Sequence, residues 1–367
     1  DYGEKERYEC FIELFSIIFN QYENYLENRK EIDFADLIVY AINNISKKLK
    51  KVSFKRIVVD EYQDIARGRF RLLKEIMKQN DDCRIMCVGD DWQAIYGFTG
   101  SDIKLTLNYS DIFGKHSRID LDRSFRFSQP LLDVSSRFIQ KNNNQLKKEI
   151  ISHPADSDPV IEIYEQTNNI SDVLDLVEKQ KPTNHKWDVM ILGRYKFKEP
   201  DNLEEVQKKY KNLNIEFKTI HRSKGLGADV VILVGLEAGK YGFPSYIESD
   251  PLMNMVITGE DDFLHAEERR VFYVAMTRAK KKLYLCTSKT MPSEFIDELK
   301  QGEYPEVYFK NDAIESRLMS CPNCGGKLNL KYPNRKKGFA WSCQLAPYCD
   351  GKAKFCNINY TSSCYTI

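Results

Sequence analysis

Two apolar runs that each end in carboxylates constrain this chain more than any other feature. Residues 56–64 read RIVVDEYQD, and residues 84–93 read RIMCVGDDWQ. An apolar, β-branched run of this length predicts a buried parallel strand, whose carboxyl end delivers polar side chains to a sheet edge. The first run would present Asp60 and Glu61 there. A strand ending in Asp-Glu is also compatible with a helix cap or a solvated turn, but Gln63 and the second run favour an active-site edge.

The composition is that of a globular protein with two to three domains. The chain has 367 residues, of which 42% are hydrophobic and 30% are charged. No apolar run approaches the length of a membrane span, and no signal-peptide pattern is present. The net charge is only +1, so nucleic-acid binding would depend on local basic clusters. Four of the ten cysteines have metal-like spacing, and we expect a reducing, cytoplasmic compartment.

Helix-like and strand-like segments alternate along the chain. The spacing of apolar residues predicts helices over 1–30 and 33–49. A strand at 56–60, a helix at 68–79 and a strand at 84–88 complete one α/β layer. Five further apolar runs, separated by helix-like segments, predict a second parallel-sheet domain. These runs are 160–164, 189–192, 217–220, 230–234 and 283–286.

The two strand-and-acid elements resemble motifs of the UvrD-like (Rep) branch of superfamily 1 helicases, ATP-driven motors that move along single-stranded DNA. Residues 60–64 (DEYQD) resemble the Walker B element of that family. Residues 89–100 (GDDWQAIYGFTG) resemble its third motif. The Asp-Asp-Trp-Gln sequence within the third motif and the presence of C-terminal cysteines most resemble the helicase IV subgroup.

The resemblance implies roles for the side chains at the first sheet edge. Asp60 would hold Mg²⁺, and Glu61 would orient and activate the water that attacks the γ-phosphate of ATP. Gln93 would contact the γ-phosphate and couple it to the DNA site, because an amide can donate to phosphate and accept from water. Gln63 is expected among the nucleotide-binding residues.

Two arginines of the second domain are expected to reach the same phosphate. Residues 121–128 (LDRSFRFS) resemble the fourth motif, in which Arg126 would approach the γ-phosphate and Phe125 would stack on adenine. Residues 267–280 (EERRVFYVAMTRAK) resemble the sixth motif, with Arg278 as the second arginine. Such guanidinium groups stabilise transition-state charge, so ATP would bind between two lobes. Taken alone, an arginine between two phenylalanines also fits an amphipathic strand.

Contacts with DNA are expected from two other segments. Residues 217–226 (FKTIHRSKGL) resemble the fifth motif, which contacts the DNA backbone. Tyr96 and Phe98 would stack on bases, although an aromatic pair two residues apart also fits half-buried strand packing. In the fifth motif, three side chains can donate to phosphate: Thr219, His221 and Lys224.

Four cysteines near the end have the spacing of a zinc site. Cys321, Cys324, Cys343 and Cys349 form C-x₂-C-x₁₈-C-x₅-C, which supplies two thiolate pairs for tetrahedral Zn²⁺. The block resembles the Cys₄ zinc finger of type IA topoisomerases. Cys356 is a rival fourth ligand, and disulfides are the alternative. Basic and aromatic residues interleave in this block, which suggests a nucleic-acid-binding module.

The chain departs from the family pattern in its phosphate loop. No G-x-x-x-x-G-K-[ST] segment occurs in the 367 residues, so the β- and γ-phosphates lack their main cradle. We therefore expect a C-terminal portion of a longer helicase that is inactive alone. The alternative is a degenerate, non-motor DNA-binding or regulatory protein. Gly227 stands where the family usually has a ribose-reading glutamate, and Thr99 stands where many members have arginine.

These resemblances imply an α/β chain of tandem RecA-like parallel-sheet domains, the first incomplete, with a small C-terminal zinc ribbon. The expected function is an ATP-dependent DNA helicase or translocase that moves 3′ to 5′ in DNA repair or recombination. Its cofactors would be ATP, Mg²⁺ and Zn²⁺, and its partner single-stranded DNA or a partial duplex. The expected parts are the tail of a helical accessory subdomain (1–30), the C-terminal part of the first RecA-like domain (31–118), the second RecA-like domain (119–312), the zinc finger (318–358) and a tail (359–367).

Overall fold

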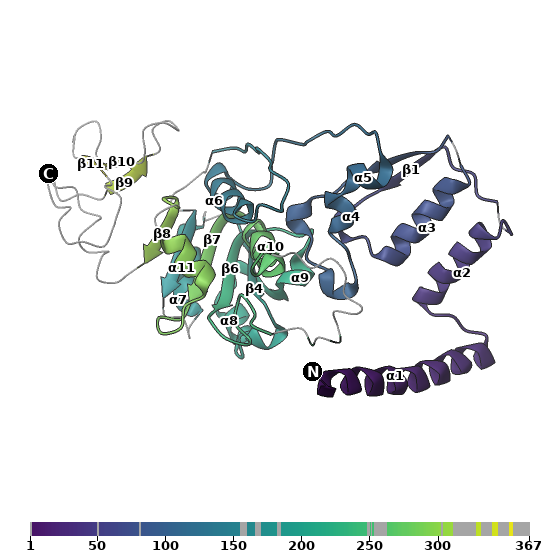
Figure 1. Cartoon of the computed structure of the whole chain (residues 1–367). Coiled ribbons are helices and arrows are strands. Elements are labelled where there is room, and N and C mark those ends of the chain that lie inside the picture. The colour runs from purple at the N-terminus through teal and green to yellow at the C-terminus, as the bar shows by residue number, and fades with distance from the viewer. Residues whose placement is uncertain are drawn as a thin grey trace. The chain divides into compact units, whose positions relative to one another are not determined.

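The computed structural model of the chain contains two compact units (Figure 1). The first comprises residues 1–117 with 248–262, and the second comprises 118–247 with 263–367. No helix in the described part of the chain is long and apolar enough to cross a membrane. The structure describes residues 2–49, 51–80, 82–154, 160–165, 170–181, 185–247, 250, 252, 263–301, 304–310, 328–331, 340–343 and 352–354.

The first unit contains a two-stranded parallel sheet with helices. Strands β1 (Arg56–Val59) and β2 (Arg84–Cys87) pair with Val59 opposite Cys87. Asp33 caps the second helix, because its carboxylate accepts the Asp36 N–H at 2.8 Å. The helices of this unit are α1 (Tyr2–Arg29), α2 (Phe34–Ser46), α3 (Arg67–Lys78), α4 (Lys104–Leu107) and α5 (Tyr109–Phe113), and its 3₁₀ turns are η1 (Tyr62–Asp64), η2 (Asp91–Gln93) and η3 (Gly97–Thr99).

The two faces of this small sheet have different surroundings. On one face, Ile57 and Ile85 pack against a core that includes Leu73 of α3. On the other face, Val58 is 67% exposed and Met86 is 60% exposed. Parallel sheets are normally covered on both faces. One face of the sheet is therefore open in the described first unit.

The second unit is built on a six-stranded, fully parallel sheet. Its strand order is β5-β4-β6-β7-β3-β8. Each of the five runs expected from the sequence overlaps one of the strands β3 to β7, the run 217–220 only as far as residue 219. This overlap confirms the parallel-sheet α/β class. The strands are β3 (Ile161–Glu165), β4 (Trp187–Gly193), β5 (Leu213–Thr219), β6 (Ala228–Leu236), β7 (Ala279–Thr287) and β8 (Val307–Lys310).

Helices pack on both faces of this sheet. Helices α7 (Ser171–Gln180) and α8 (Leu203–Lys209) contribute to one core, with Val173 and Val206 fully or almost fully buried. A second core joins three other helices through Phe138, Phe272 and Phe295, whose ring centroids lie 5.0 to 5.4 Å apart. These helices are α6 (Gln129–Gln140), α10 (Ala266–Met276) and α11 (Glu294–Lys300). The short elements are α9 (Ile220–Ser223) and η4 (Lys196–Lys198).

A small antiparallel sheet lies near the C-terminus. Strand β10 (Ala340–Cys343) pairs with β9 (Leu328–Lys331) on one side and with β11 (Lys352–Lys354) on the other. Trp341 stands opposite Leu330 and Ala353 in the two pairings. Only the backbone of these strands is described.

Candidate nucleotide and DNA sites

Asp60 and Glu61 follow β1 directly, at the carboxyl edge of the first sheet, and both side chains are exposed. The Glu61 N–H donates to Asp60 Oδ1 at 2.9 Å, whereas Asp60 Oδ2 has no protein partner in the described part of the chain. Glu61 has φ 48° and ψ 43°, a left-handed conformation that costs about 1–2 kcal/mol for a residue with a Cβ. Strain of this kind concentrates at functional sites. The exposed carboxylate oxygens suit Mg²⁺, which prefers oxygen ligands.

The buried amide of Gln63 joins the loops that follow the two strands. Its side chain is 1% exposed. Gln63 Nε2 donates to Glu61 Oε2 at 2.5 Å, and Gln63 Oε1 accepts the Asp90 N–H at 2.9 Å. An amide side chain can donate to a carboxylate through its NH₂ group and accept from a backbone N–H through its oxygen. Gln63 therefore holds the carboxylate of Glu61 in a fixed relation to the second loop.

Asp90 extends this network to the glutamine of the third motif. Asp90 Oδ2 accepts from Gln93 Nε2 at 2.6 Å, and Asp90 Oδ1 accepts the Trp92 N–H at 3.1 Å. Glu61, Gln63, Asp90 and Gln93 thus form one continuous chain of hydrogen bonds. The sequence placed Glu61, Gln63 and Gln93 at this edge but did not predict the link through Asp90. The signal was the position of Asp90, three residues before Gln93.

Gly89 allows the two loops to approach one another. A Cβ atom at this position would lie 2.5 Å from Gln63 Oε1 and 3.2 Å from the backbone nitrogens of Gln63 and Tyr62. The Tyr62 N–H donates to the carbonyl oxygen of Val88 at 2.9 Å, which fixes the same approach. Any larger residue at position 89 would separate Gln63 from Asp90.

The predicted base-stacking residues lie in a turn and not in a strand. Phe98 belongs to η3 and is 64% exposed. The ring centroids of Tyr96 and Phe98 are 6.1 Å apart, with 55° between the ring planes. Partial burial, together with the carboxylates of Asp64 and Glu61, raises the pKa of the Tyr96 phenol. Half-buried strand packing is therefore excluded for Phe98, whose ring surface is accessible.

Phe125 and Arg126 lie on the irregular segment that precedes α6. Phe125 is 81% exposed, and the side chain of Arg126 is also exposed. The Arg126 N–H donates to Ser124 Oγ at 3.4 Å. In the second unit, both side chains are accessible to a ligand.

Arg278 has a different environment from the other predicted arginine. Its side chain is 0% exposed, just beyond the end of α10. Arg278 Nε donates to the carbonyl oxygen of Val274 at 2.9 Å, and Nη1 donates to that of Leu226 at 3.1 Å. The guanidinium group thus ties α10 to the loop that follows α9. The role of Arg278 at the γ-phosphate stays a prediction. Its structural role, joining α10 to the Leu226 loop, follows from the two hydrogen bonds.

The three donors predicted in the fifth motif occupy one short segment of the second unit. Thr219 ends β5, His221 lies in α9, and Lys224 follows α9. All three side chains are partly exposed. Thr219 stands opposite Gly193 of β4, so this segment lies at the carboxyl edge of the six-stranded sheet.

The predicted zinc ligands fall almost entirely outside the described residues. Cys321, Cys324 and Cys349 lie outside the described residues, and only the backbone of Cys343 is described. Among the side chains that the structure describes, no group of three or more His, Cys, Asp or Glu residues could hold a metal ion. The zinc site therefore stays a prediction.

Both units match families of known helicase domains. Residues 4–114 match the UvrD/REP helicase N-terminal domain, and residues 165–290 match the UvrD-like helicase C-terminal domain. The chain carries UvrD-like helicase domains. Glu61, Gln93 and Phe98 lie within the first matched stretch, and the fifth and sixth motifs lie within the second. Phe125 and Arg126 fall between the two UvrD-like matches.

Three curated relatives are similar to the UvrD-like domains of this chain. DNA helicase IV of Escherichia coli (strain K12) is 36% identical over 294 residues, which is 80% of this chain and 42% of that protein. The Probable DNA helicase II homolog of Mycoplasma capricolum subsp. capricolum is 29% identical over 189 residues, covering 49% of this chain and 26% of that protein. ATP-dependent DNA helicase PcrA of Staphylococcus epidermidis is 26% identical over 151 residues, which is 40% of this chain and 20% of that protein. The chain spans less than half of the length of each relative.

Proposed function

We propose that this chain forms part of the motor core of an ATP-dependent DNA helicase or translocase acting on single-stranded DNA. The observation that carries the proposal is the hydrogen-bond chain from Glu61 through Gln63 and Asp90 to Gln93, inside a UvrD-like domain. The finer parts of the proposal are movement in the 3′ to 5′ direction, a role in DNA repair or recombination, and a cytoplasmic location.

The hydrogen-bond chain gives each residue of the first domain a role. Bound MgATP would supply the phosphoryl group and neutralise part of its charge. Asp60 would hold the cation through Oδ2. Glu61 would accept a proton from the attacking water, in an orientation that Gln63 fixes. Because Asp90 holds Gln93, a movement of Gln93 would reach Glu61 through three successive hydrogen bonds.

The second UvrD-like domain would contribute positive charge and a stacking ring. Arg126 would approach the γ-phosphate and Phe125 would stack on adenine, and their exposure supports both roles. Arg278 would need to leave its backbone partners to reach a phosphate. We therefore assign the larger share of direct phosphate contact to Arg126, and to Arg278 the support of the loop that holds Lys224.

The chain would work together with further helicase residues. Its 367 residues contain no glycine-rich phosphate loop with Lys-Ser/Thr, and the chain spans 42% of DNA helicase IV. The exposed Val58 and Met86 support the same proposal, since an apolar sheet face of this kind is normally covered. We expect no ATP hydrolysis above background from this chain alone.

A Cys₄ zinc ribbon is the last part of the proposal. The pairing of β9, β10 and β11 supports it, because Cys321 and Cys324 precede this antiparallel sheet. Cys343 ends β10, and Cys349 precedes β11. Two ligand pairs on either side of a short ribbon are the arrangement that tetrahedral Zn²⁺ requires.

The complete protein, produced from its whole gene, provides the test. ATP hydrolysis would be measured with and without single-stranded DNA, and unwinding would be measured on duplexes with a 3′ or a 5′ tail. The proposal predicts DNA-stimulated hydrolysis and unwinding of the 3′-tailed duplex. DNA binding without hydrolysis would instead support the non-motor alternative, and preference for the 5′ tail would overturn the direction.

A further inference from the structure

A cluster of aromatic rings lies at one edge of the six-stranded sheet, outside the helicase motifs. We call Tyr195, Phe197 and Tyr241 the aromatic cluster. The rings of Tyr195 and Phe197 are stacked, with centroids 5.1 Å apart and 7° between the planes. The Tyr241 ring meets both edge-on, at 6.0 and 5.8 Å. Phe197 is 63% exposed and Tyr241 is 53% exposed, so the cluster offers apolar ring surface to solvent.

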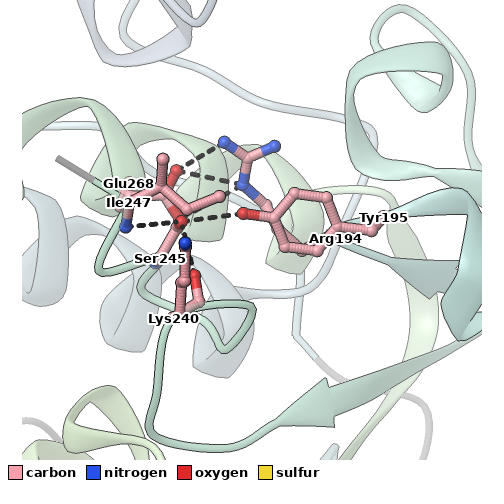
Figure 2. A network of polar contacts seen from close by, with 6 residues as sticks. All are labelled: Arg194, Tyr195, Lys240, Ser245, Ile247 and Glu268. Carbon is pink, nitrogen blue, oxygen red and sulfur yellow. Dashed lines mark hydrogen bonds and ion pairs between the residues drawn. The ribbon is translucent and has the colours of Figure 1, made fainter. Parts of the chain in front are cut away.

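A polar network that includes the Tyr195 hydroxyl fixes the orientation of this ring (Figure 2). Arg194 donates to Glu268 through Nε at 3.0 Å and through Nη2 at 2.7 Å. Glu268 Oε2 accepts the Ser245 N–H at 3.0 Å, and the Tyr195 hydroxyl donates to Ser245 Oγ at 2.7 Å. The Arg194 and Glu268 side chains are only 22% and 12% exposed. The ring of Tyr195 is thus held in place before any ligand arrives, which reduces the entropic cost of binding.

The loop that carries Tyr241 is also held tightly. The Phe243 N–H donates to the Glu237 carbonyl oxygen at 2.9 Å, and the Gly242 N–H donates to that of Gly239 at 2.9 Å. A Cβ atom on Gly242 would collide with the Glu237 carbonyl oxygen. Glycine at this position therefore permits the turn that presents Tyr241.

The sheet register places the aromatic cluster beside the fifth-motif segment. Strand β4 lies between β5 and β6, with Gly193 opposite both Thr219 and Val234. All three strands are parallel, so the segments that follow them emerge at the same sheet edge. Tyr195 and Phe197 follow β4, the fifth motif follows β5, and Tyr241 follows β6.

This edge has an excess of basic residues in a chain that is nearly neutral overall. Segments 194–198, 218–224 and 237–247 contain seven lysines and arginines and a single acid, Glu237, whereas the whole chain has a net charge of +1. At least three of the seven cations are ion-paired: Arg194 with Glu268, Lys198 with Glu237 at 3.3 Å, and Lys218 with Glu216 at 2.8 Å. Lys196 and Lys240 are exposed at the surface. Anionic ligands are therefore attracted to the surface around the rings.

We propose that the aromatic cluster is a base-stacking platform for single-stranded DNA, adjoining the backbone contacts of the fifth motif. Exposed rings among cations are the chemistry that sequence-tolerant single-strand binding uses. Thr219, His221 and Lys224 would hold phosphates, and the bases of neighbouring nucleotides would lie on Phe197 and Tyr241. This inference rests on the proposed function, because it assigns further substrate contacts to the same DNA site.

Fluorescence anisotropy of the full chain with a labelled oligo-dT strand tests the platform. The double variant Phe197→Ala/Tyr241→Ala should weaken oligo-dT binding on the order of tenfold or more. An abasic strand of the same length has no bases to stack, so its affinity should be the same for wild type and variant. Phe197→Leu should weaken binding as Phe197→Ala does, whereas Phe197→Tyr should retain it. Phe34→Ala removes a ring that is 90% exposed elsewhere and is the matched control.

Three results would overturn the inference and separate it from the proposed function. If the double variant binds oligo-dT like wild type while Lys224→Ala loses affinity, the platform is wrong but the DNA site stands. If wild type does not bind oligo-dT at all, the proposed DNA function of this chain fails as well. If DNA affinity is unchanged but sedimentation shows altered self-association, the rings form a protein contact instead.

Discussion

Gln63 Nε2 lies 2.5 Å from Glu61 Oε2, and Oε1 of the same amide accepts the Asp90 N–H at 2.9 Å. Asp90 in turn accepts from Gln93 at 2.6 Å. The carboxylate expected to activate water and the amide expected to sense the γ-phosphate are therefore separated by two intervening side chains. Because Gln63 and Asp90 each bond to both neighbours, the network can transmit a displacement from one loop to the other.

Gln63→Leu tests this positioning role. Leucine has a similar volume but loses both hydrogen bonds. In the complete protein, kcat for DNA-stimulated ATP hydrolysis should fall on the order of tenfold or more, with KM for ATP changed less than about twofold. Steady-state kinetics measures both. Gln79→Leu is the matched control, because Gln79 lies at the end of α3 and bonds to the backbone carbonyl of Ile45 and the N–H of Val52. Equal losses of kcat in the two variants would contradict the positioning role.

Arg278 and Arg126 are expected to differ in what they contribute to stability. Arg278→Ala removes a buried guanidinium group that binds two backbone carbonyls, and should lower the free energy of unfolding by about 2–4 kcal/mol. Arg126 is exposed, so Arg126→Ala should change it by less than about 0.5 kcal/mol. Urea unfolding of the chain compares the two. A small effect of Arg278→Ala would show that the guanidinium is not needed to join α10 to the Leu226 loop.

A buried ion pair makes the second unit sensitive to acid. Burial alone would raise the pKa of Glu298, but hydrogen bonds from Arg269 and Tyr304 and the charges of Arg269 and Lys141 outweigh burial and lower it below the ordinary value of 4.5. Arg269 Nη2 lies 2.7 Å from Glu298 Oε2. A carboxylate with a lowered pKa stabilises the fold above its unfolded pKa, and this stabilisation is lost as pH falls through the folded pKa.

Glu298→Gln should therefore cost about 3 kcal/mol of unfolding free energy at pH 7. The difference between wild type and variant should remain down to about pH 5 and shrink below 4.5, as the wild-type carboxylate is protonated. Urea unfolding at a series of pH values measures this difference. A gap that widens toward low pH would contradict the assigned sign.

The zinc prediction can be checked by metal content. The purified chain should contain one zinc ion, measured by mass spectrometry of the metal, and Cys321→Ser should lose it. Cys349→Ser should also lose zinc, whereas Cys356→Ser should retain it. If Cys356→Ser loses zinc and Cys349→Ser retains it, the fourth ligand is Cys356 and the assignment of Cys349 is wrong. A zinc-free wild-type chain prepared without chelators would contradict the site itself.

The strands that could be predicted from the sequence are those with continuous apolar runs. Apolar runs located β1 to β7, because parallel strands covered by helices need continuous apolar residues. The edge strand β8 (Val307–Lys310) was not predicted, since its short apolar run is not followed directly by a pair of carboxylates, as that of β1 is. Asp60 and Glu61 were placed correctly at the carboxyl edge of β1, because carboxylates cannot continue a buried strand.

The contacts within the site could not be predicted from residue types. Gln63 and Asp90 are 27 positions apart, and the residue types of the two motifs do not indicate that the Gln63 amide oxygen accepts the Asp90 N–H. Arg278 was expected as the second γ-phosphate arginine, and its bond to the carbonyl oxygen of Leu226, 52 positions away, could not be read from the motif. The aromatic cluster had a visible signal in the segment RYKFK after β4, but its third ring comes from the loop after β6.

Glu61→Gln in the complete protein tests the central claim most directly. The substitution keeps the size and shape of the side chain but removes the carboxylate that would accept the proton of the attacking water. DNA-stimulated ATP hydrolysis should fall on the order of a hundredfold or more, while the affinity for oligo-dT stays within about twofold of wild type. Hydrolysis at the wild-type rate by Glu61→Gln would contradict the assignment of this sheet edge as the catalytic site.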